Sequence, residues 1–333
     1  GVTWTFHLNP DRMWSDGSQV TAHDYEFTFK RLLDPANANN YAWFYFSAFK
    51  NAGPVNRGEM PVEELGVKAL DDVTLEITTE GPVPYLLMIL SFPTSWPVNK
   101  AMVEQHGDDW AKDVSTVLSN GPYMPVEWNR GRELVSELNP YYTGPKKPML
   151  EKIVTSFIPQ GAPTMPMYQA GELYNVGGGQ QADYIAIIND NELRKDADIY
   201  AAPFTRYVWF NTLEPPFDDI RVRQAVRYAI DRQAIADQVT LGMNIPTLTM
   251  IPAGRLCSSS GDEALQQYGE FNPEKGRELL AEAGYPDGEG FPEFEMWTFA
   301  GEAVPEREAI QSMLRQNLCI TVIPKDVERA VFK

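Results

Sequence analysis

The sequence has few of the residues that catalysis and metal binding need. It holds three histidines and two cysteines among 333 residues. His7, His23 and His106 show neither His-x-x-x-His nor Glu-x-x-His spacing, so no zinc site is indicated. No Gly-x-Ser-x-Gly motif occurs, and neither Cys257 nor Cys319 lies in the signature of a cysteine nucleophile. These absences argue against an enzyme and predict a binding protein without metal or cofactor.

Positive charge and long apolar runs are also scarce. The chain has 28 Lys and Arg against 46 Asp and Glu, a formal net charge of −18. This balance disfavours nucleic acid or an anionic membrane as a partner. It is compatible with a solvated acidic surface or with neutral and cationic ligands. The longest apolar run, residues 85–92, is far shorter than the roughly 20 residues of a membrane-spanning helix.

Two cysteines are too few for a fold that depends on disulfides. They fit a reducing compartment, or a periplasm whose proteins are stable without disulfide bonds. Cys257 and Cys319 could pair only if the fold brought their α-carbons to roughly 6 Å, which their spacing in the sequence does not reveal.

Alternation and turn residues predict the strands. Residues 2–8 alternate polar and apolar side chains, as a half-buried strand does. Two hairpins are expected, one around Asp71-Asp72 and one around residues 129–131. Their strands and the remaining expected strands cover residues 67–70, 73–77, 123–128, 133–138, 153–158, 199–211 and 320–323.

Capping residues predict the helices. Thr21 and Asp24 resemble a capping box that opens a helix ending before Asp34. Asp218 or Asp219 caps a second helix, and Asn272-Pro273 opens a third. A fourth covers 305–318. The first 160 residues are therefore strand-rich and the last 130 alternate helix and strand, which indicates an α/β protein of several domains, divided near residues 100 and 204.

Aromatic side chains supply the positive signal for binding. One cluster comprises Tyr41, Trp43, Phe44, Tyr45 and Phe46, and another comprises Tyr207, Trp209 and Phe210. Aromatic rings offer a large contact area with few rotatable bonds, which suits the binding of varied ligands. The alternative interpretation is that these residues belong to the core. Residues 177–179 are three glycines that match neither a Walker A nor a dinucleotide-binding loop.

A dozen motifs in register resemble one family. They include WTFHL (4–8), WSDG (14–17), VTAHD (20–24), GVKALDD (66–72), NGPY (120–123), NPYY (139–142), FDDIRVRQA (217–225), AIDR (229–232) and LLAEAGY (279–285). The chain resembles the oligopeptide-binding proteins of bacterial ABC importers, extracellular solute-binding protein family 5. The likeness covers essentially the whole sequence.

The resemblance implies a fold and its division. It implies an α/β, two-lobed periplasmic binding protein fold of type II, in its three-domain peptide-binding variety, incomplete at both termini. Residues 1–100 would form the small, strand-rich second domain and 101–203 part of the first domain. Residues 204–333 would form the N-terminal part of the third domain, in the second lobe. We therefore expect this chain to be the middle portion of a longer protein.

The resemblance also implies candidate ligand-binding residues. Tyr41 matches a tyrosine of the family's cleft, and Phe92 occupies a position where a polar pocket residue can occur. Gly177, Gly178 and Gly179 lie in a loop that reaches the ligand in the family, although the polar residues typical of that loop are replaced here. Tyr207 and Trp209 lie on the expected strand whose residues line side-chain pockets in the family. We expect these residues to face a common cleft.

The implied function is that of a non-enzymatic receptor. It would capture extended oligopeptides between its lobes and deliver them to the permease subunits of an ABC transporter, as a monomer and without nucleic acid. It would be periplasmic, or lipid-anchored at the outer face of the cytoplasmic membrane. The alternatives are the same fold with another solute (a dipeptide, a murein peptide, glutathione or a nickel complex) and, more remotely, an α/β hydrolase. Residues that hold the peptide termini in the family would lie beyond Lys333.

Overall fold

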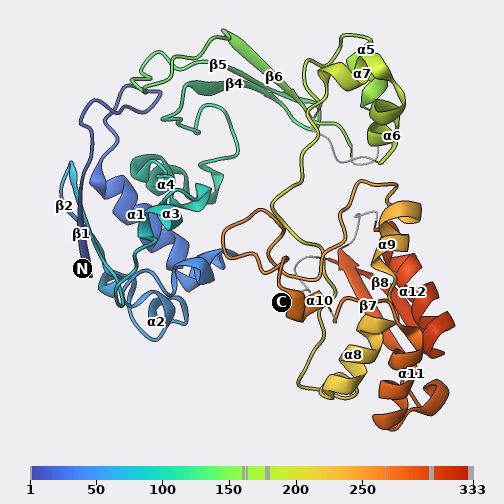
Figure 1. Ribbon diagram of the computed structural model, residues 1–333. Coiled ribbons are helices and arrows are strands. Elements are labelled where there is room, and N and C mark those ends of the chain that lie inside the picture. The colour runs from blue at the N-terminus through green and yellow to red at the C-terminus, as the bar shows by residue number, and fades with distance from the viewer. Residues whose placement is uncertain are drawn as a thin grey trace. The chain divides into compact units, whose positions relative to one another are not determined.

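The chain forms two compact units, Gly1–Ile158 and Pro159–Lys333. The computed structural model describes residues 2–159, 162, 164–176, 181–266, 268–299 and 304–328. Figure 1 shows both units along the chain. The domain boundaries expected near residues 100 and 204 stay a prediction, because spatial compactness alone does not divide the chain into the family's domains.

The first unit contains two antiparallel sheets and four α-helices (Figure 1). One sheet has the strand order β1-β3-β2 and the other β4-β5-β6. The elements are β1 (Thr3–His7), α1 (Ala22–Leu33), α2 (Ala52–Asn56), β2 (Val67–Asp71), β3 (Thr74–Thr78), α3 (Leu86–Leu90), α4 (Lys100–His106), β4 (Tyr123–Asn129), β5 (Glu133–Leu138) and β6 (Lys152–Ser156). Five 3-10 helices lie between them: η1 (Pro35–Asn37), η2 (Ala42–Tyr45), η3 (Val62–Glu64), η4 (Pro93–Ser95) and η5 (Gly107–Asp109).

The strand predictions of this unit are confirmed in position and pairing. In β1, Trp4 pairs with Ile77 and Phe6 with Leu75, so one face of the alternating strand covers the core while its polar residues are exposed. The hairpin of β2 and β3 turns at the predicted acidic pair. In the second sheet, Pro125 lies on the edge strand β4 beside a register shift; edge strands and bulges are the positions at which sheets accept proline.

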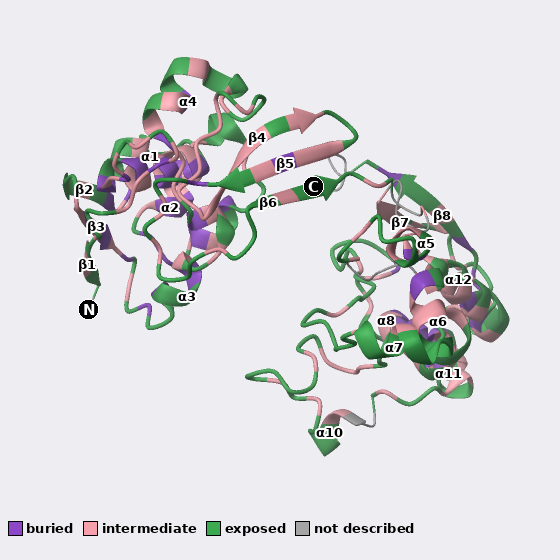
Figure 2. Cartoon of the chain, turned by 90° about the horizontal axis from the view of Figure 1, so that it is seen from above, coloured by how far each residue is buried: buried purple, intermediate pink, exposed green. Residues whose placement is uncertain are grey.

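Helix α1 supplies much of the first core. Its capping box is confirmed: the side chain of Thr21 accepts from Asp24 N, and the Asp24 carboxylate accepts from Thr21 N. The helix packs on β2 and buries Phe29, Leu32 and Leu33 among residues of the first sheet. In Figure 2 the buried residues of this unit gather around α1 and α2, while β4, β5 and β6 are mostly half-buried or exposed.

The second unit contains a parallel β-α-β element with helices packed on it (Figure 1). Strands β7 and β8 pair in parallel, and α12 connects them. The elements are α5 (Met165–Gln169), α6 (Gln181–Asn189), α7 (Asn191–Asp196), α8 (Ile220–Tyr228), α9 (Arg232–Ala234), the π-helix η6 (Ile235–Val239), α10 (Glu263–Gln266), α11 (Pro273–Glu282), η7 (Pro286–Gly288), β7 (Phe294–Phe299), α12 (Pro305–Leu318) and β8 (Val322–Val327).

The core of this unit joins α8, α11, α12 and β8. Val222, Ala225, Leu280, Leu314 and Leu318 are all at most 1% exposed. A glycine in α11 permits the close approach of the helices: a Cβ at Gly276 would lie 3.1 Å from the carbonyl oxygen of Ala225. The helix starts predicted at Asp219, Asn272 and Pro305 are confirmed.

Three expectations need correction or completion. The strand expected over 199–211 is wrong: these residues, all described, form neither helix nor strand, and Thr205 and Arg206 bind other segments through their side chains. The strand expected at 320–323 is instead Val322–Val327 and shares only residues 322 and 323 with the expected range. Helix α12 ends at Leu318 as expected, and Cys319, in a left-handed backbone conformation, is its C-cap. Cys257 and Cys319 are both unpaired and exposed.

A pH-dependent contribution to stability is expected from Glu26 on α1. Burial would raise the pKa of this carboxyl, but hydrogen bonds from Lys30 Nζ (2.6 Å) and Ala69 N (2.9 Å) outweigh it and hold the pKa below its ordinary value. A lowered folded-state pKa stabilises the fold fully above the unfolded pKa of about 4.3, and the contribution disappears as the pH falls through the folded pKa.

Denaturant unfolding between pH 7 and pH 3 measures this contribution. Glu26→Gln is expected to lower stability at pH 7 and to reduce the loss of stability on acidification. Glu104→Gln is the control. Glu104 also forms an ion pair with a lysine four residues away in a helix, Lys100, but in this pair both side chains are about half exposed. Equal pH slopes for wild type and Glu26→Gln would contradict the assignment.

Candidate functional site

In the first unit, the aromatic cluster divides into core and surface. Tyr45 is fully buried, and its hydroxyl lies 2.7 Å from the hydroxyls of Thr94 and Ser95. Phe44 and Phe46 are half-buried and pack against the core. The core interpretation is therefore confirmed for Tyr45, whereas Tyr41 and Trp43 are 47% and 64% exposed.

Ring contacts connect the exposed residues to this core. The rings of Tyr41 and Phe92 lie 5.2 Å apart between centroids, and Phe92 lies 4.9 Å from Phe44. Trp43 contacts Phe44 edge-on at 5.9 Å. The structure thus brings together two of the predicted site residues, Tyr41 and Phe92. Trp43 extends the same ring cluster at the surface, and the sequence could not separate it from its buried neighbours because all lie on one short 3-10 helix.

In the second unit, Tyr207 and Trp209 form an exposed pair. Their ring centroids lie 6.5 Å apart with the planes nearly perpendicular, and the side chains are 57% and 66% exposed. The next residue, Phe210, is half-buried and stacks on Phe217 at 4.7 Å. The core interpretation therefore holds for Phe210, and the two predicted site residues are brought together at the surface.

Polar contacts hold the segment that carries this pair. The hydroxyl of Thr205 donates to the carbonyl oxygen of Met250 at 2.9 Å. Arg206 Nη1 donates to both carboxylate oxygens of Glu306, at 3.2 and 3.4 Å. The sequence alone does not reveal this ion pair, because no local pattern relates residues 100 positions apart.

The predicted site residues fall into three separate parts of the chain. Gly177, Gly178 and Gly179 lie outside the described residues. Tyr41 and Phe92 belong to one compact unit, and Tyr207 and Trp209 belong to the other. A common cleft for all of them stays a prediction.

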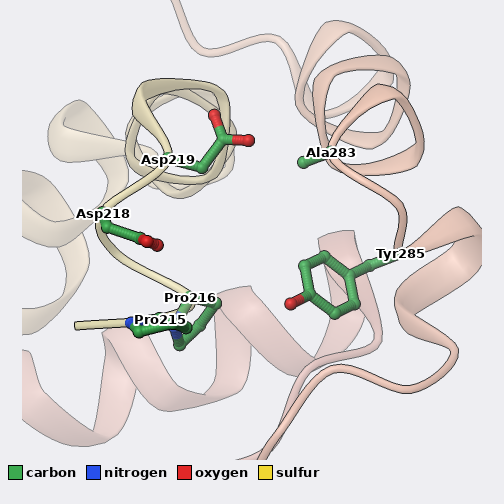
Figure 3. A pocket seen from close by; sticks show the side chains of 6 residues that line it. All are labelled: Pro215, Pro216, Asp218, Asp219, Ala283 and Tyr285. Atoms are coloured by element: carbon green, nitrogen blue, oxygen red, sulfur yellow. The ribbon is translucent and has the colours of Figure 1, made fainter.

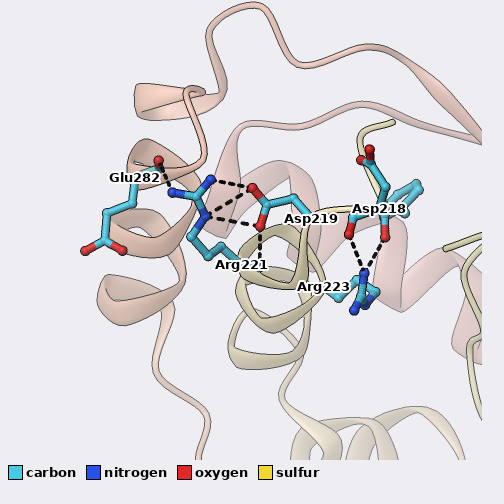
Figure 4. Close-up of polar contacts among 6 residues, drawn as sticks. Asp218, Asp219, Arg221, Arg223 and Glu282 are labelled. Atoms are coloured by element: carbon cyan, nitrogen blue, oxygen red, sulfur yellow. Dashed lines mark hydrogen bonds and ion pairs between the residues drawn. The ribbon is translucent and has the colours of Figure 1, made fainter. Parts of the chain in front are cut away.

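A pocket of about 380 Å³ lies at the start of α8, shown in Figure 3. Asp218, Asp219 and the two prolines before them form one side, and Ala283 and Tyr285 form the other. One of its two carboxylates, that of Asp219, already has a structural role (Figure 4). Asp219 caps α8 by accepting from Arg221 N, and hydrogen bonds from Arg221 lower the pKa of Asp219.

The two neighbouring arginines also hold the structure together through hydrogen bonds to backbone carbonyl oxygens. Arg221 Nη1 donates to the carbonyl oxygen of Glu282 at 2.6 Å, which joins the start of α8 to the end of α11. Arg223 Nη1 donates to the carbonyl oxygens of Phe217 and Asp218. Asp219 therefore serves as the helix cap that the sequence indicated. Among the described residues there is no group of three or more His, Cys, Asp or Glu that could hold a metal ion, and none of the described helices is long and apolar enough to cross a membrane.

Comparison with known sequences identifies relatives over most of the chain. The sequence is 32% identical over 292 residues to the periplasmic oligopeptide-binding protein OppA of Escherichia coli, covering 85% of this chain and 52% of that protein. It is 33% identical over 288 residues to the probable deoxycholate-binding periplasmic protein YgiS of the same species, covering 86% and 53%. The chain spans about half the length of these relatives.

Solved structures share the fold. A periplasmic oligopeptide-binding protein from Borrelia burgdorferi superposes with a TM-score of 0.81 at 30% identity, covering 100% of this chain and 65% of that one. Haemophilus influenzae OppA in complex with RPPGFSPFR gives 0.72 at 27% identity, covering 99% and 65%. These neighbours confirm the expected periplasmic peptide-binding fold, of which this chain is a part.

The family assignment rests on the full sequence. Residues 1–333 match the family described as "Bacterial extracellular solute-binding proteins, family 5 Middle". The expected resemblance is confirmed by this match and by the relatives above. The chain belongs to family 5 of the bacterial extracellular solute-binding proteins.

Proposed function

We propose that this chain is the middle portion of a receptor that captures extended oligopeptides and delivers them to an ABC importer. The observation that carries the proposal is the pair of exposed, anchored aromatic groups, one in each unit of a chain from this family. The Haemophilus influenzae relative bound RPPGFSPFR, a peptide with two phenylalanines and three prolines. Apolar side chains of this kind gain contact area on exposed rings.

The proposed mechanism is binding without covalent chemistry. The peptide would lie extended, with its main chain hydrogen-bonded to both lobes in the manner of an added strand. The residues proposed to bind it are Tyr41 and Phe92 of the first unit, Tyr207 and Trp209 of the second, and Gly177, Gly178 and Gly179. The receptor would act as a monomer in the periplasm, or lipid-anchored at the outer face of the cytoplasmic membrane, and would pass its ligand to permease subunits.

A second candidate is the same fold with a different solute. The observation that favours it is the similarity to YgiS, a probable deoxycholate-binding periplasmic protein. Exposed aromatic rings present flat apolar surfaces. The apolar face of a steroid could pack on these rings, as an apolar peptide side chain would.

Titration calorimetry of the full-length protein separates these candidates. We expect heat of binding with RPPGFSPFR and with at least one of a set of di-, tri- and pentapeptides, and none with deoxycholate. Binding of deoxycholate without binding of any peptide would establish the second candidate instead. Release of free amino acids from a peptide would show that the protein is a hydrolase.

Trp209→Ala is expected to weaken peptide binding by about 30-fold, because a central tryptophan commonly contributes 2 kcal/mol or more to an interface. The measurement is the dissociation constant for the same peptide. Trp297→Ala is the matched control: this tryptophan lies on β7 of the same unit and is 41% exposed. Equal effects of both substitutions would contradict the role of Trp209.

A further inference from the structure

The segment that presents Tyr207 and Trp209 has no regular structure of its own. Residues 199–211 lie outside every helix and strand, so no ladder or helix hydrogen bonds hold their backbone in register. A ligand that binds to such a segment has to order it at an entropic cost, unless contacts within the protein already hold it. Contacts on either side of the rings attach this segment to the rest of the unit.

The C-terminal contact is apolar and the N-terminal one is ionic. Phe210 follows Trp209 and packs into the core against Phe217. Arg206 precedes Tyr207 and forms the ion pair with Glu306. The ring pair thus lies between two attachments, each adjacent to it in the chain. Thr205 adds a hydrogen bond to Met250 next to the ionic one.

Glu306 is well placed to be the fixed partner. It lies in the first turn of α12, where the helix dipole favours a carboxylate. Its side chain is only 13% exposed, and Oε1 also accepts from Asn244 Nδ2 at 2.9 Å. The helix itself is anchored by the buried Leu314 and Leu318. Arg206, by contrast, is 63% exposed and sits on the irregular segment, so the helix positions the segment rather than the reverse.

We propose that Arg206 and Glu306 are positioning residues for ligand binding: their ion pair attaches the Tyr207–Trp209 segment to α12 and preorganises the two rings. The inference rests on the proposed function, since it assigns the rings to the ligand site. It adds that affinity depends on two residues that need not touch the ligand. An ion pair with one largely exposed partner is modest in strength, so its loss is expected to weaken ligand binding about three- to fivefold.

The test compares Arg206→Gln, Glu306→Gln and the double variant in the full-length protein. The dissociation constant for RPPGFSPFR is expected to rise about three- to fivefold in each single variant and no further in the double variant, because the two residues act through one contact. Effects that multiply in the double variant, or no effect in either single one, would overturn the proposal. About 1 M salt should erase the difference between wild type and Arg206→Gln, because it screens exposed charges.

A second readout follows the rings without any ligand. In protein labelled with 5-fluorotryptophan, the fluorine resonance of Trp209 is assigned by its loss in Trp209→Phe. It is expected to narrow and shift toward free fluorotryptophan in Arg206→Gln and Glu306→Gln, while the Trp297 resonance stays unchanged. An unchanged Trp209 resonance would refute the attachment. A changed resonance with unchanged affinity would refute its importance for binding.

Two controls separate this proposal from the proposed function and from general destabilisation. Glu192→Gln removes a carboxylate from an exposed ion pair within α7 and is expected to change neither readout, whereas Arg206→Lys keeps the charge and is expected to retain most of the affinity. If the wild type binds none of the peptides, the proposed function fails, and the fluorine spectra still decide whether the ion pair holds the rings.

Discussion

Phe29→Ala is expected to lower the free energy of unfolding by about 3–5 kcal/mol, the range for a large aromatic side chain removed from a packed core. Phe29 is 1% exposed on the buried face of α1. Its ring contacts Phe49 edge-on at 4.9 Å and Tyr45 at 5.9 Å. The cavity would therefore open beneath the 3-10 helix that carries the exposed rings, and the loss is large against a typical net stability of about 5–15 kcal/mol.

Denaturant unfolding of the full-length protein, followed by circular dichroism, measures this loss. Phe29→Leu keeps most of the volume and is expected to cost much less than the alanine variant. Trp43→Ala is the surface control on the same cluster, with a change within about 0.5 kcal/mol because the side chain is 64% exposed. A loss below about 1 kcal/mol for Phe29→Ala would show that the core can collapse around the missing ring.

Asp24→Ala is expected to destabilise the first unit by about 3–5 kcal/mol, since four buried or part-buried donors lose their acceptor together. The Asp24 carboxylate is nearly buried and accepts from Thr21 N (2.9 Å), Thr21 Oγ1 (3.0 Å), Lys100 N (3.0 Å) and Trp14 Nε1 (3.4 Å). It therefore closes the capping box of α1 and also connects that helix to the start of α4 and to the buried indole of Trp14.

Asp34→Ala provides the matched comparison at the other end of α1. Asp34 accepts from Ala36 N alone in an exposed setting, so its loss should cost only about 1 kcal/mol. Asp24→Asn is expected to fall between the two alanine variants, because its amide keeps one acceptor oxygen but turns a donor toward other donors. Equal losses for Asp24→Ala and Asp34→Ala would mean that Asp24 acts as a helix cap and nothing more.

Local signals predicted the secondary structure well where neighbours in the chain supply the contacts. The capping box at Thr21, the hairpin turning at Asp71-Asp72 and the start of α11 at Asn272 each depend on residues a few positions apart. The strand predicted over 199–211 was wrong for the opposite reason. The aromatic-rich sequence of this segment suits a strand, but Thr205 and Arg206 bind Met250 and Glu306, whose positions no local pattern reveals.

The same distinction between local and long-range contacts applies to the candidate site. The sequence by itself determined the family and the two aromatic segments, because a dozen of the family's motifs occur in this chain in register. It did not determine which rings are exposed, since Trp43 and Tyr45 are two residues apart on one turn, yet one is 64% exposed and the other fully buried. Exposure, the four donors on Asp24 and the Arg206–Glu306 pair were decided by the tertiary structure, because each depends on contacts between residues far apart in the chain.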